Sequence, residues 1–416
     1  MKNFNWKAIG PGLIWAGAAV GVSHIVQSTR AGADFGFQLV IVVLLANLFK
    51  YPFFQYGPRY AIATGESLIE GYHRMGKWVV ILFLILTIGT MFAILAAVTS
   101  VTVGIITSVI PTSLSYVAVT ILLLLFCAII ILLGQYKTLD RLMKGVVLIL
   151  TVSTLVAFFV AFAKSETSVL VNQQPFEWNV ANVAFLIALV GWMPSAIDIS
   201  VWNSLWTLAK IEATGYRPKL KEVLLDFNIG YLGTTILSLA FLGLGALVMF
   251  NTGQEFANGG TQFANQFFEL YTNSIGQWAF VIIAIAAIAT MFSTTLTVLD
   301  AYPRVLNPVV GILIPKSGLP KTQKKLSYLW MIILVIGAVT IISKLSEQMK
   351  LLVDIATTLS FITAPVLGYL NLRAITAKHV DKAYRPSVGM MILSWTGLVV
   401  LAGFASYYLL MKVGLL

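Results

Sequence analysis

The residues with the clearest chemical potential lie between Gly191 and Ser200, where the sequence reads GWMPSAIDIS. This stretch sits inside a long apolar segment, residues 180–208. Pro194 lacks a backbone N–H and its ring clashes with the preceding turn, so the sequence predicts that a helix breaks here. Asp198 adds a carboxylate four residues later. Because peptide groups freed by a break in hydrocarbon need a partner, we expect a binding site at this point.

The chemistry expected of these residues is binding rather than catalysis. The sequence has no Walker A loop, no G-x-S-x-G nucleophile elbow, no H-E-x-x-H zinc motif and no cysteine pair. Neither ATP-driven pumping nor intramembrane hydrolysis therefore has a basis in the sequence. We expect a protein that is not an enzyme, that needs no cofactor, and that draws on ion or substrate gradients.

The composition indicates which solvent surrounds these residues. The chain has 416 residues, of which 59% are hydrophobic and only 10% are charged, and its mean hydropathy is +0.90. Repeated apolar runs of about 18 residues or more are typical of membrane-spanning helices. The sequence thus predicts an all-α polytopic membrane protein with the lipid bilayer as its main partner. Disulfides are excluded because Cys127 is the only cysteine.

Eleven apolar segments, each bounded by charges or turn residues, are expected to cross the bilayer. They fall at residues 9–29, 37–62, 78–108, 113–133, 144–163, 180–208, 226–250, 278–303, 326–344, 348–373 and 387–411. No cleavable signal peptide is expected, and Met1 is expected to stay on the chain.

The basic residues are distributed unevenly between the two sides of the membrane. With the N-terminus inside, 21 of the 27 Lys and Arg residues fall in inside segments, five fall outside, and Lys50 lies within a span. This asymmetry predicts a cytoplasmic N-terminus and an outside C-terminus in the inner or plasma membrane. The net charge of +11 is explained by topology, so we expect no nucleic-acid partner.

The first and sixth spans carry matching interruptions. The first begins near Gly10 and is interrupted about ten residues later by GVSH, residues 21–24, as the sixth is by GWMPS, residues 191–195. Such a pair is typical of a five-plus-five inverted repeat whose broken helices bind substrate at the midplane. We expect one transmembrane domain, 1–416, acting as a monomer. Helices 1–5 (9–143 and 144–163) and 6–10 (180–373) would form the repeats, and residues 387–411 would add helix 11.

Several motifs resemble one known family. The run GPGLIWAGAAVGVSHIVQSTRAGADFGF, residues 10–37, is similar to the first transmembrane helix of the NRAMP (natural resistance-associated macrophage protein) divalent-metal transporters. Met193 and Pro194 fall where that family has a Met-Pro-His motif. Weaker matches follow in the same order: PRYAIATGESL (58–68), the D-x-x-I-G sequence at 226–230, and FSTTLTVLDAY (292–302). The resemblance covers nearly the whole chain and implies a LeuT-type fold of eleven helices that works by alternating access.

The sequence departs from the NRAMP pattern at the metal site. The Asp-Pro-Gly-Asn that the resemblance leads us to expect in helix 1 reads Gly21, Val22, Ser23, His24, so the carboxylate is lost. Residue 195 is serine where the family has histidine. Residues 78–108 contain no Asp, Glu, Lys or Arg, whereas the resemblance implies acidic residues there, and span 9 lacks a buried arginine. Proton coupling by the family's usual path is therefore not expected.

We expect the two interruptions and their polar neighbours to line the substrate site. The expected substrate-binding residues are Gly21, Ser23, His24, Gln27, Gly191, Met193, Ser195 and Asp198. His24 and Met193 are the candidate metal ligands, because transition ions accept imidazole and thioether. A core histidine and a packing methionine are the alternatives for these two residues.

Two basic residues at membrane depth favour an anionic cargo. Intramembrane charges are costly and are usually functional or paired, and Arg30 and Lys50 would add to the positive ends of the broken helices. The alternatives are that Lys50 holds helices together through Asp198, Asp300 or Asp354, and that Arg30 reaches to the outer surface.

These observations lead to three functional hypotheses. The first is a secondary transporter for a metal in an anionic organic complex, with citrate-like carboxylates as the example, or for the organic anion itself. The second is a transporter of a bare or partly hydrated divalent metal ion, which the family resemblance supports. The third is a membrane receptor or sensor that binds without transporting.

Overall fold

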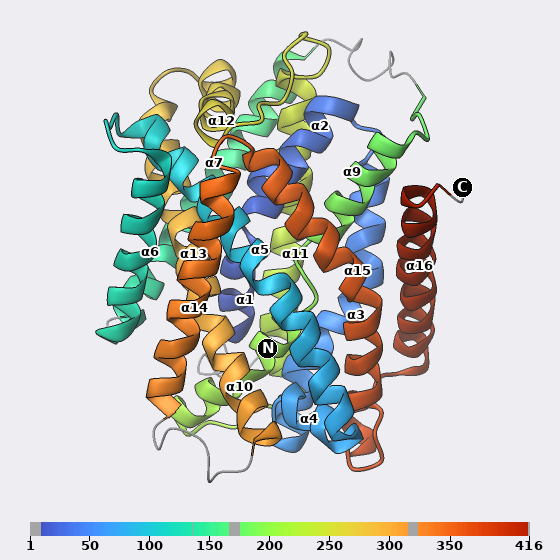
Figure 1. Cartoon of the computed structure of the whole chain (residues 1–416). Helices are drawn as coiled ribbons and strands as arrows, with labels where there is room; N and C mark the ends of the chain where they lie inside the picture. The colour runs from blue at the N-terminus through green and yellow to red at the C-terminus, as the bar shows by residue number, and fades with distance from the viewer. Residues whose placement is uncertain (1–9, 135, 166–174, 315–322, 415–416) are drawn as a thin grey trace.

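The computed structural model describes residues 10–134, 136–165, 175–314 and 323–414, and over these residues it consists of helices without a β-strand (Figure 1). Seven of the described helices are long and apolar enough to cross a membrane, and three shorter ones are also apolar. Helices dominate because a bilayer offers no water to peptide groups, which must pair within their own segment. The all-α fold predicted from composition is confirmed.

The first and sixth predicted spans are interrupted. The first is divided into α1 (Pro11–Ala19), a π-helical turn η2 (Ser23–Ser28) and α2 (Thr29–Phe35). The sixth is divided into α9 (Val180–Gly191) and α10 (Ile199–Thr214), with residues 192–198 outside any helix. Both breaks are confirmed. The first lies at residues 20–21 rather than over the whole of 21–24, because residues 23 and 24 already belong to the wide turn of η2.

The other nine spans are continuous. They are α3 (Val40–Thr64), α5 (Lys77–Val109), α6 (Tyr116–Leu132), α7 (Tyr136–Lys164), α11 (Leu220–Val248), α13 (Ala279–Leu313), α14 (Gln323–Lys344), α15 (Met349–Ile375) and α16 (Val388–Lys412). Eleven helical spans are thus present, as the sequence predicted.

Three features of the connections were not predicted. Helix α13 continues about ten residues beyond the expected end of span 8, through Pro303 and Pro308. The connectors contain two additional helices, α4 (Leu68–Met75) and α12 (Gly260–Ile275), and a short 3₁₀ turn, η4 (Lys382–Tyr384). Helix α12 buries Phe263, Phe267 and Tyr271, spaced four residues apart on one face. This face packs onto the bundle.

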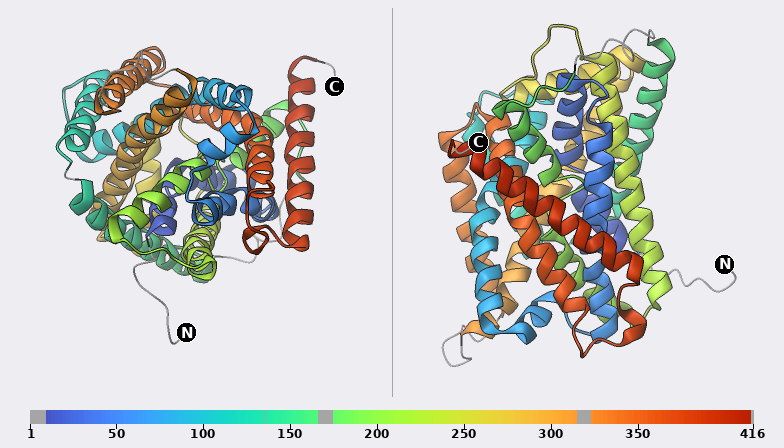
Figure 2. Two further views of the ribbon diagram at one scale, coloured as in Figure 1. Left: turned by 90° about the horizontal axis from the view of Figure 1, so that it is seen from below. Right: turned by 90° about the vertical axis from the view of Figure 1, so that its right-hand side faces the viewer.

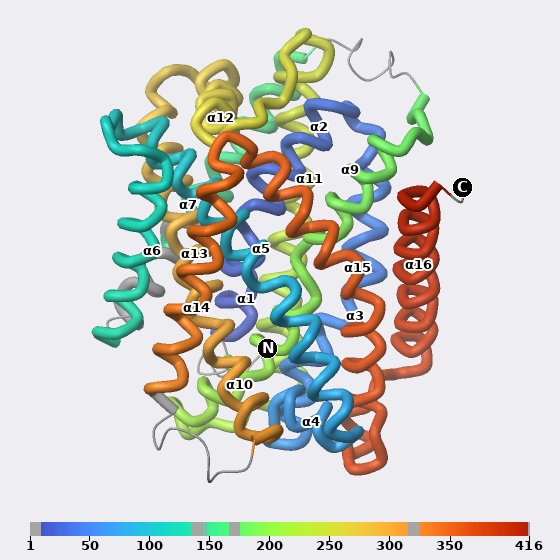
Figure 3. The backbone as a smooth tube through the Cα atoms, in the orientation of Figure 1, coloured from blue at the N-terminus to red at the C-terminus, as the bar shows by residue number. Residues whose placement is uncertain are grey.

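The interrupted spans lie inside the bundle, packed among the continuous helices. Helix α1 packs against α10, α11 and α13, whereas α9 packs mainly against α15. Figure 2 shows α16 along one edge of the molecule, and the tube in Figure 3 lets the reader follow the chain through both breaks. We call the two ends of the bundle the α4 end and the α12 end, after the connecting helices found there (Figure 1).

An aromatic cluster fixes α1 to its neighbours. The ring of Trp15 stacks on Tyr231 of α11 with 5.2 Å between centroids, and its edge contacts Phe54 of α3 at 5.3 Å. The outer surface has the opposite character, since large apolar side chains such as Val399 and Ile392 are exposed there. An exposed apolar surface of this kind is expected where lipid replaces water.

Candidate substrate-binding site

The break in the first span exposes backbone groups near the centre of the bundle. Val20 has an extended backbone conformation and its carbonyl accepts a hydrogen bond from Thr294 Oγ1 of α13 at 3.3 Å. The Gly21 carbonyl instead accepts from the amides of His24 and Ile25, at 3.1 and 2.9 Å. The turn of η2 therefore begins at Gly21, and it places Ser23 and His24 at the start of the half of this span nearer the α12 end.

The break in the sixth span is longer and contains a cis peptide bond between Met193 and Pro194. Helix α9 ends at Gly191 and α10 begins at Ile199. The ammonium of Lys50, on α3, donates hydrogen bonds to backbone carbonyls at this break. Lys50 is fully buried, so its charge is compensated by the backbone and not by solvent.

A cavity of about 30 Å³ lies where the two breaks meet. Its walls come from both breaks and from the two long helices α5 and α13. The lining residues are Ala18, Ala19, Val22, Ser23, Ile94, Val98, Trp192, Ser195, Ala196, Asp198, Ile199, Trp202, Thr294 and Val298. A cavity of about 10–15 Å³ holds one water molecule, so this one has room for a small ion with a water or two.

Asp198 is the one charged residue among those that line this cavity. Its Oδ2 atom accepts a hydrogen bond from the Tyr302 hydroxyl of α13 at 3.3 Å. Its Oδ1 atom is buried and has no hydrogen-bond partner among the residues that the structure describes. A buried carboxylate oxygen without a partner is costly, and a bound cation would compensate for that cost.

His24 lies next to the cavity, but both of its ring nitrogens are engaged within the protein. Nε2 is 3.0 Å from the Thr234 carbonyl of α11, and Nδ1 is 2.7 Å from Ser23 Oγ. Because a carbonyl can only accept, Nε2 carries a hydrogen and donates it to Thr234. The imidazole thus ties η2 to α11, and the expectation that it offers a free lone pair to a metal is corrected.

Met193 also lies away from the cavity. Its side chain is fully buried in an apolar cluster with Ala31, Leu189 and Leu242, and it is not among the cavity-lining residues. The extended segment after α9 carries the neighbouring Trp192 and Ser195 to the cavity instead. Met193 therefore packs between helices, and its thioether does not line the cavity.

Gln27 and Arg30 lie further toward the α12 end, outside the cavity. Arg30 Nη1 is 2.8 Å from Asp354 Oδ1 of α15, and Gln27 Nε2 donates to the same oxygen at 3.2 Å. The Arg30 Nε atom also donates to Asp34 at 3.2 Å. The charge of Arg30 is thus paired with two carboxylates, and Arg30 is not an isolated charge that extends to the surface.

These contacts correct the expectation of an anion site. The charge of Arg30 is paired with carboxylates, and the charge of Lys50 is directed at carbonyls. Neither residue lines the cavity, whose charged group is the carboxylate of Asp198. Gly191 contributes its carbonyl to Lys50 and its Cα surface to close packing on α15. The charged and hydroxyl side chains that line the cavity are therefore Asp198, Ser23, Ser195 and Thr294.

Sequence reasoning missed three contributors to this region. Thr294, which lines the cavity, and Tyr302, which donates to Asp198, both lie in the motif at 292–302, but sequence reasoning assigned them no role. Trp192 also lines the cavity, and its indole N–H donates to Ser360 Oγ at 2.8 Å. The partner of Arg30 could have been found, because Asp354 is the sole acidic residue in the sequence of α15. Intramembrane charges of opposite sign are usually paired.

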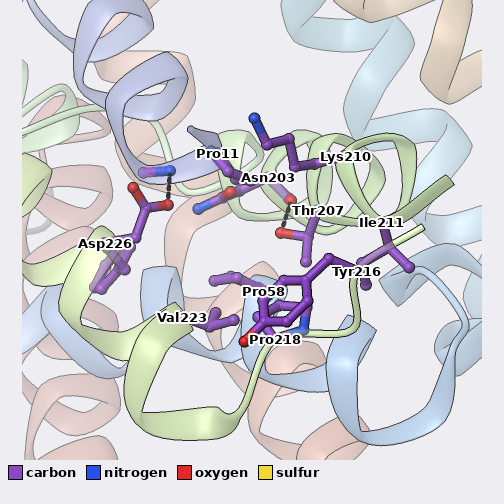
Figure 4. A pocket seen from close by; sticks show the side chains of 12 residues that line it. Pro11, Pro58, Asn203, Thr207, Lys210, Ile211, Tyr216, Pro218, Val223 and Asp226 are labelled. Carbon is purple, nitrogen blue, oxygen red and sulfur yellow. Dashed lines mark hydrogen bonds between the residues drawn. The ribbon is translucent and has the colours of Figure 1, made fainter. Parts of the chain in front are cut away.

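A second polar region lies at the α4 end, beneath the start of α1. Asp226 of α11 accepts hydrogen bonds from the amides of Gly10 and Gly12, at 3.0 and 2.6 Å. Figure 4 shows Asp226 beside Pro11 and Asn203 around a small cavity. A carboxylate at a helix N-terminus satisfies free amides and complements the helix dipole. Asp226 therefore anchors α1, the half of the interrupted first span nearer the α4 end.

Two broken helices that meet at a small buried site, inside a bundle of eleven helical spans, define the LeuT-type fold. The sequence matches the family described as Natural resistance-associated macrophage protein-like over residues 12–411. The chain therefore belongs to this family of membrane transporters, and the family resemblance seen in the sequence is confirmed. An uncharacterized protein of Pasteurella multocida (strain Pm70) is 35% identical, over 98% of this chain and 93% of its own length.

Solved structures share the fold at low sequence identity. A manganese transporter of Eremococcus coleocola, in a mutant form, superimposes with a TM-score of 0.66 at 14% identity, covering 95% of this chain and 84% of that chain. Mhp1, a nucleobase-cation-symport-1 family transporter, gives 0.60 at 13%, covering 96% and 92%. A Na⁺-coupled sialic acid symporter gives 0.60 at 15%, covering 96% and 89%. Their substrates differ widely, so the shared fold does not identify the cargo.

Proposed function

We propose that this protein is a secondary active transporter that carries a hard divalent metal cation, with Asp198 as its anionic ligand. The observation that carries the proposal is the buried, unpartnered Oδ1 atom of Asp198 at a cavity formed by both helix breaks. Family membership and the manganese transporter named among the structural neighbours support a metal cargo.

The size of the cavity argues against the citrate-like cargo expected from the sequence. In alternating access the substrate passes through a state in which both sides are closed, and the cavity of that state limits its size. Pockets that hold organic ligands usually measure about 300–1,000 Å³, whereas this cavity measures about 30 Å³. A single ion with part of its hydration shell fits, so the runner-up hypothesis becomes the proposal.

The available ligand atoms indicate which cations would bind. Ser23, Ser195 and Thr294 line the cavity with Asp198, so its polar groups are carboxylate, hydroxyl and carbonyl oxygens. Oxygen ligands suit hard cations such as Mg²⁺ and Mn²⁺ better than soft ones. One carboxylate compensates only part of a double charge. We therefore propose that the ion keeps some of its water.

We also propose the orientation predicted from the sequence, with the α4 end facing the cytoplasm. Arg74 and Lys77 flank the junction of α4 and α5, and Arg217 and Lys219 lie in the α10–α11 connector. The positive-inside rule places such connectors in the cytoplasm. Of the predicted inside residues, Lys2, Lys7, Lys316 and Lys321 lie outside the described part of the chain.

Uptake into proteoliposomes tests the proposed function. The purified protein is expected to accumulate Mn²⁺ and Mg²⁺, and Asp198→Asn is expected to lower uptake by at least about tenfold, since interactions with a charged group contribute about 1.5–3 kcal/mol. Asp300→Asn is the matched control, because Asp300 pairs with Arg304 on the same helix, away from the cavity. Unchanged uptake in Asp198→Asn, or uptake of citrate without any cation, would overturn the proposal. Cation-dependent thermal stabilisation without flux would assign the protein to the receptor class.

A further inference from the structure

The ammonium of Lys50 is surrounded by three backbone carbonyls at the break between α9 and α10. Its Nζ atom donates to the carbonyl oxygens of Val190 and Gly191 at 2.9 Å each, and to that of Ser195 at 2.7 Å. An ammonium has three N–H donors, and these three carbonyls use all of them. The geometry is that of a cation coordinated by carbonyl oxygens.

The break itself explains why these carbonyls need a partner. In a continuous helix the Val190 carbonyl would accept from the amide of residue 194, but Pro194 has no N–H, and the Met193 amide donates to this carbonyl instead at 3.3 Å. The Ser195 carbonyl would accept from the amide of Ile199, which instead donates to Ala196 at 3.2 Å. A carbonyl that loses its helical donor in a buried, apolar environment carries a large desolvation cost unless another donor replaces it.

A positive charge is the favoured partner for two reasons. The C-terminal end of α9 carries the negative end of its helix dipole, which attracts a cation. Rings of backbone carbonyls also replace the hydration shell of monovalent cations in membrane proteins. Arg30 pairs with Asp354 and Asp34, whereas Lys50 lies at this break, where the buried Asp198 interacts with it electrostatically.

We propose that Lys50 is a tethered cation: its ammonium fills a monovalent-cation site formed by the carbonyls of Val190, Gly191 and Ser195. The wild-type protein needs no dissolved co-ion at this place. Removal of the side chain would open the site to a free monovalent cation such as ammonium or K⁺. Because Ser195 also lines the substrate cavity, Lys50 acts as a positioning residue for the substrate site.

Chemical rescue tests this proposal on the full-length protein. Lys50→Ala is purified in choline chloride, whose cation is too large for the site, and its melting temperature is measured against added NH₄⁺, methylammonium, K⁺ and Na⁺. We expect a melting temperature several degrees below that of the parent in choline, and saturable recovery with at least one small cation. Lys344→Ala, at an exposed position near the end of α14, is the control and should show no cation response.

A second variant covers the case in which Lys50→Ala is not recovered as folded protein. Lys50→Met keeps most of the side-chain volume without the charge, and we expect it to lower the initial rate of Mn²⁺ uptake by about tenfold or more. Parental stability of either variant in choline would overturn the proposal. So would a destabilised Lys50→Ala that responds to none of the cations. The melting readout does not depend on transport, so these outcomes are distinguishable from failure of the proposed metal-transport function.

Discussion

Arg30 of α2 and Asp354 of α15 form a two-point ion pair: Nη1 of the guanidinium lies 2.8 Å from Asp354 Oδ1 and 2.9 Å from Oδ2. The guanidinium also stands 4.4 Å from the ring centre of Phe185 of α9. One side chain thus joins α2 and α9 to α15. Because these elements lie between the cavity and the α12 end, we expect the pair to keep this side of the protein closed.

Loss of the pair is expected to open the path to the cavity. We predict that Arg30→Gln increases the labelling rate of a cysteine placed at Ser195, because breaking a charged hydrogen bond costs the closed state about 1.5–3 kcal/mol. A water-soluble thiol reagent added from the α12 side measures that rate, in a Cys127→Ala background.

The control for this prediction is Arg304→Gln. It removes an i,i+4 pair with Asp300 in which the arginine side chain is 55% exposed, and such pairs contribute little. Equal labelling rates in Arg30→Gln and the parent would contradict the assignment of this pair as the closing contact.

His24 is predicted to stabilise the fold rather than to bind the metal. Its imidazole connects Ser23 to the Thr234 carbonyl, so His24→Ala removes buried hydrogen bonds within η2 and between η2 and α11, at a cost of about 0.5–1.5 kcal/mol each. We expect a lower melting temperature, while KM for Mn²⁺ changes by less than about threefold. Measurement of both quantities on the purified variant distinguishes the two roles. A rise in KM of about tenfold or more at unchanged stability would instead identify His24 as a ligand.

The breaks could be predicted from the sequence, whereas the direction of the side chains at the breaks could not. Pro194 and the glycines mark where hydrogen-bonding donors and helical preference are lost, and these are local properties. Because residues 192–198 are not helical, the 3.6-residue period of a helix does not predict which of their side chains lie on the same face. Met193 consequently packs in an apolar cluster while Ser195 lines the cavity.

The partner of Lys50 was beyond sequence reasoning for a different reason. Sequence reasoning seeks an acidic residue for a buried lysine, and Asp198, Asp300 and Asp354 were the candidates. The hydrogen bonds of Lys50 go to backbone carbonyls, which carry no signature in the sequence, while Asp198, one of the expected residues, interacts with Lys50 electrostatically. The number and nature of the spans were predictable because long apolar segments are required of any chain that crosses a bilayer.

The start of α1 is held against α11 by a contact that only glycine permits. A Cβ atom at position 12 would lie 2.3 Å from the Asp226 carbonyl oxygen, whereas one at Gly17, on the same helix, would meet no atom within 4 Å. The Gly12 amide also donates to the Asp226 carboxylate at 2.6 Å. Close backbone approach and helix capping therefore coincide at one residue.

We predict that Gly12→Ala separates α1 from α11 and weakens this cap. Overpacking typically costs about 1–3 kcal/mol, so the melting temperature and the rate of Mn²⁺ uptake should both fall. Gly17→Ala should be neutral or slightly stabilising, because alanine is favoured over glycine in a helix by about 1 kcal/mol. Thermal melts in detergent and proteoliposome uptake compare the two variants directly. If the two substitutions have equal effects, the close contact between Gly12 and Asp226 does not position α1. The anchoring of α1 must then come from the aromatic cluster around Trp15.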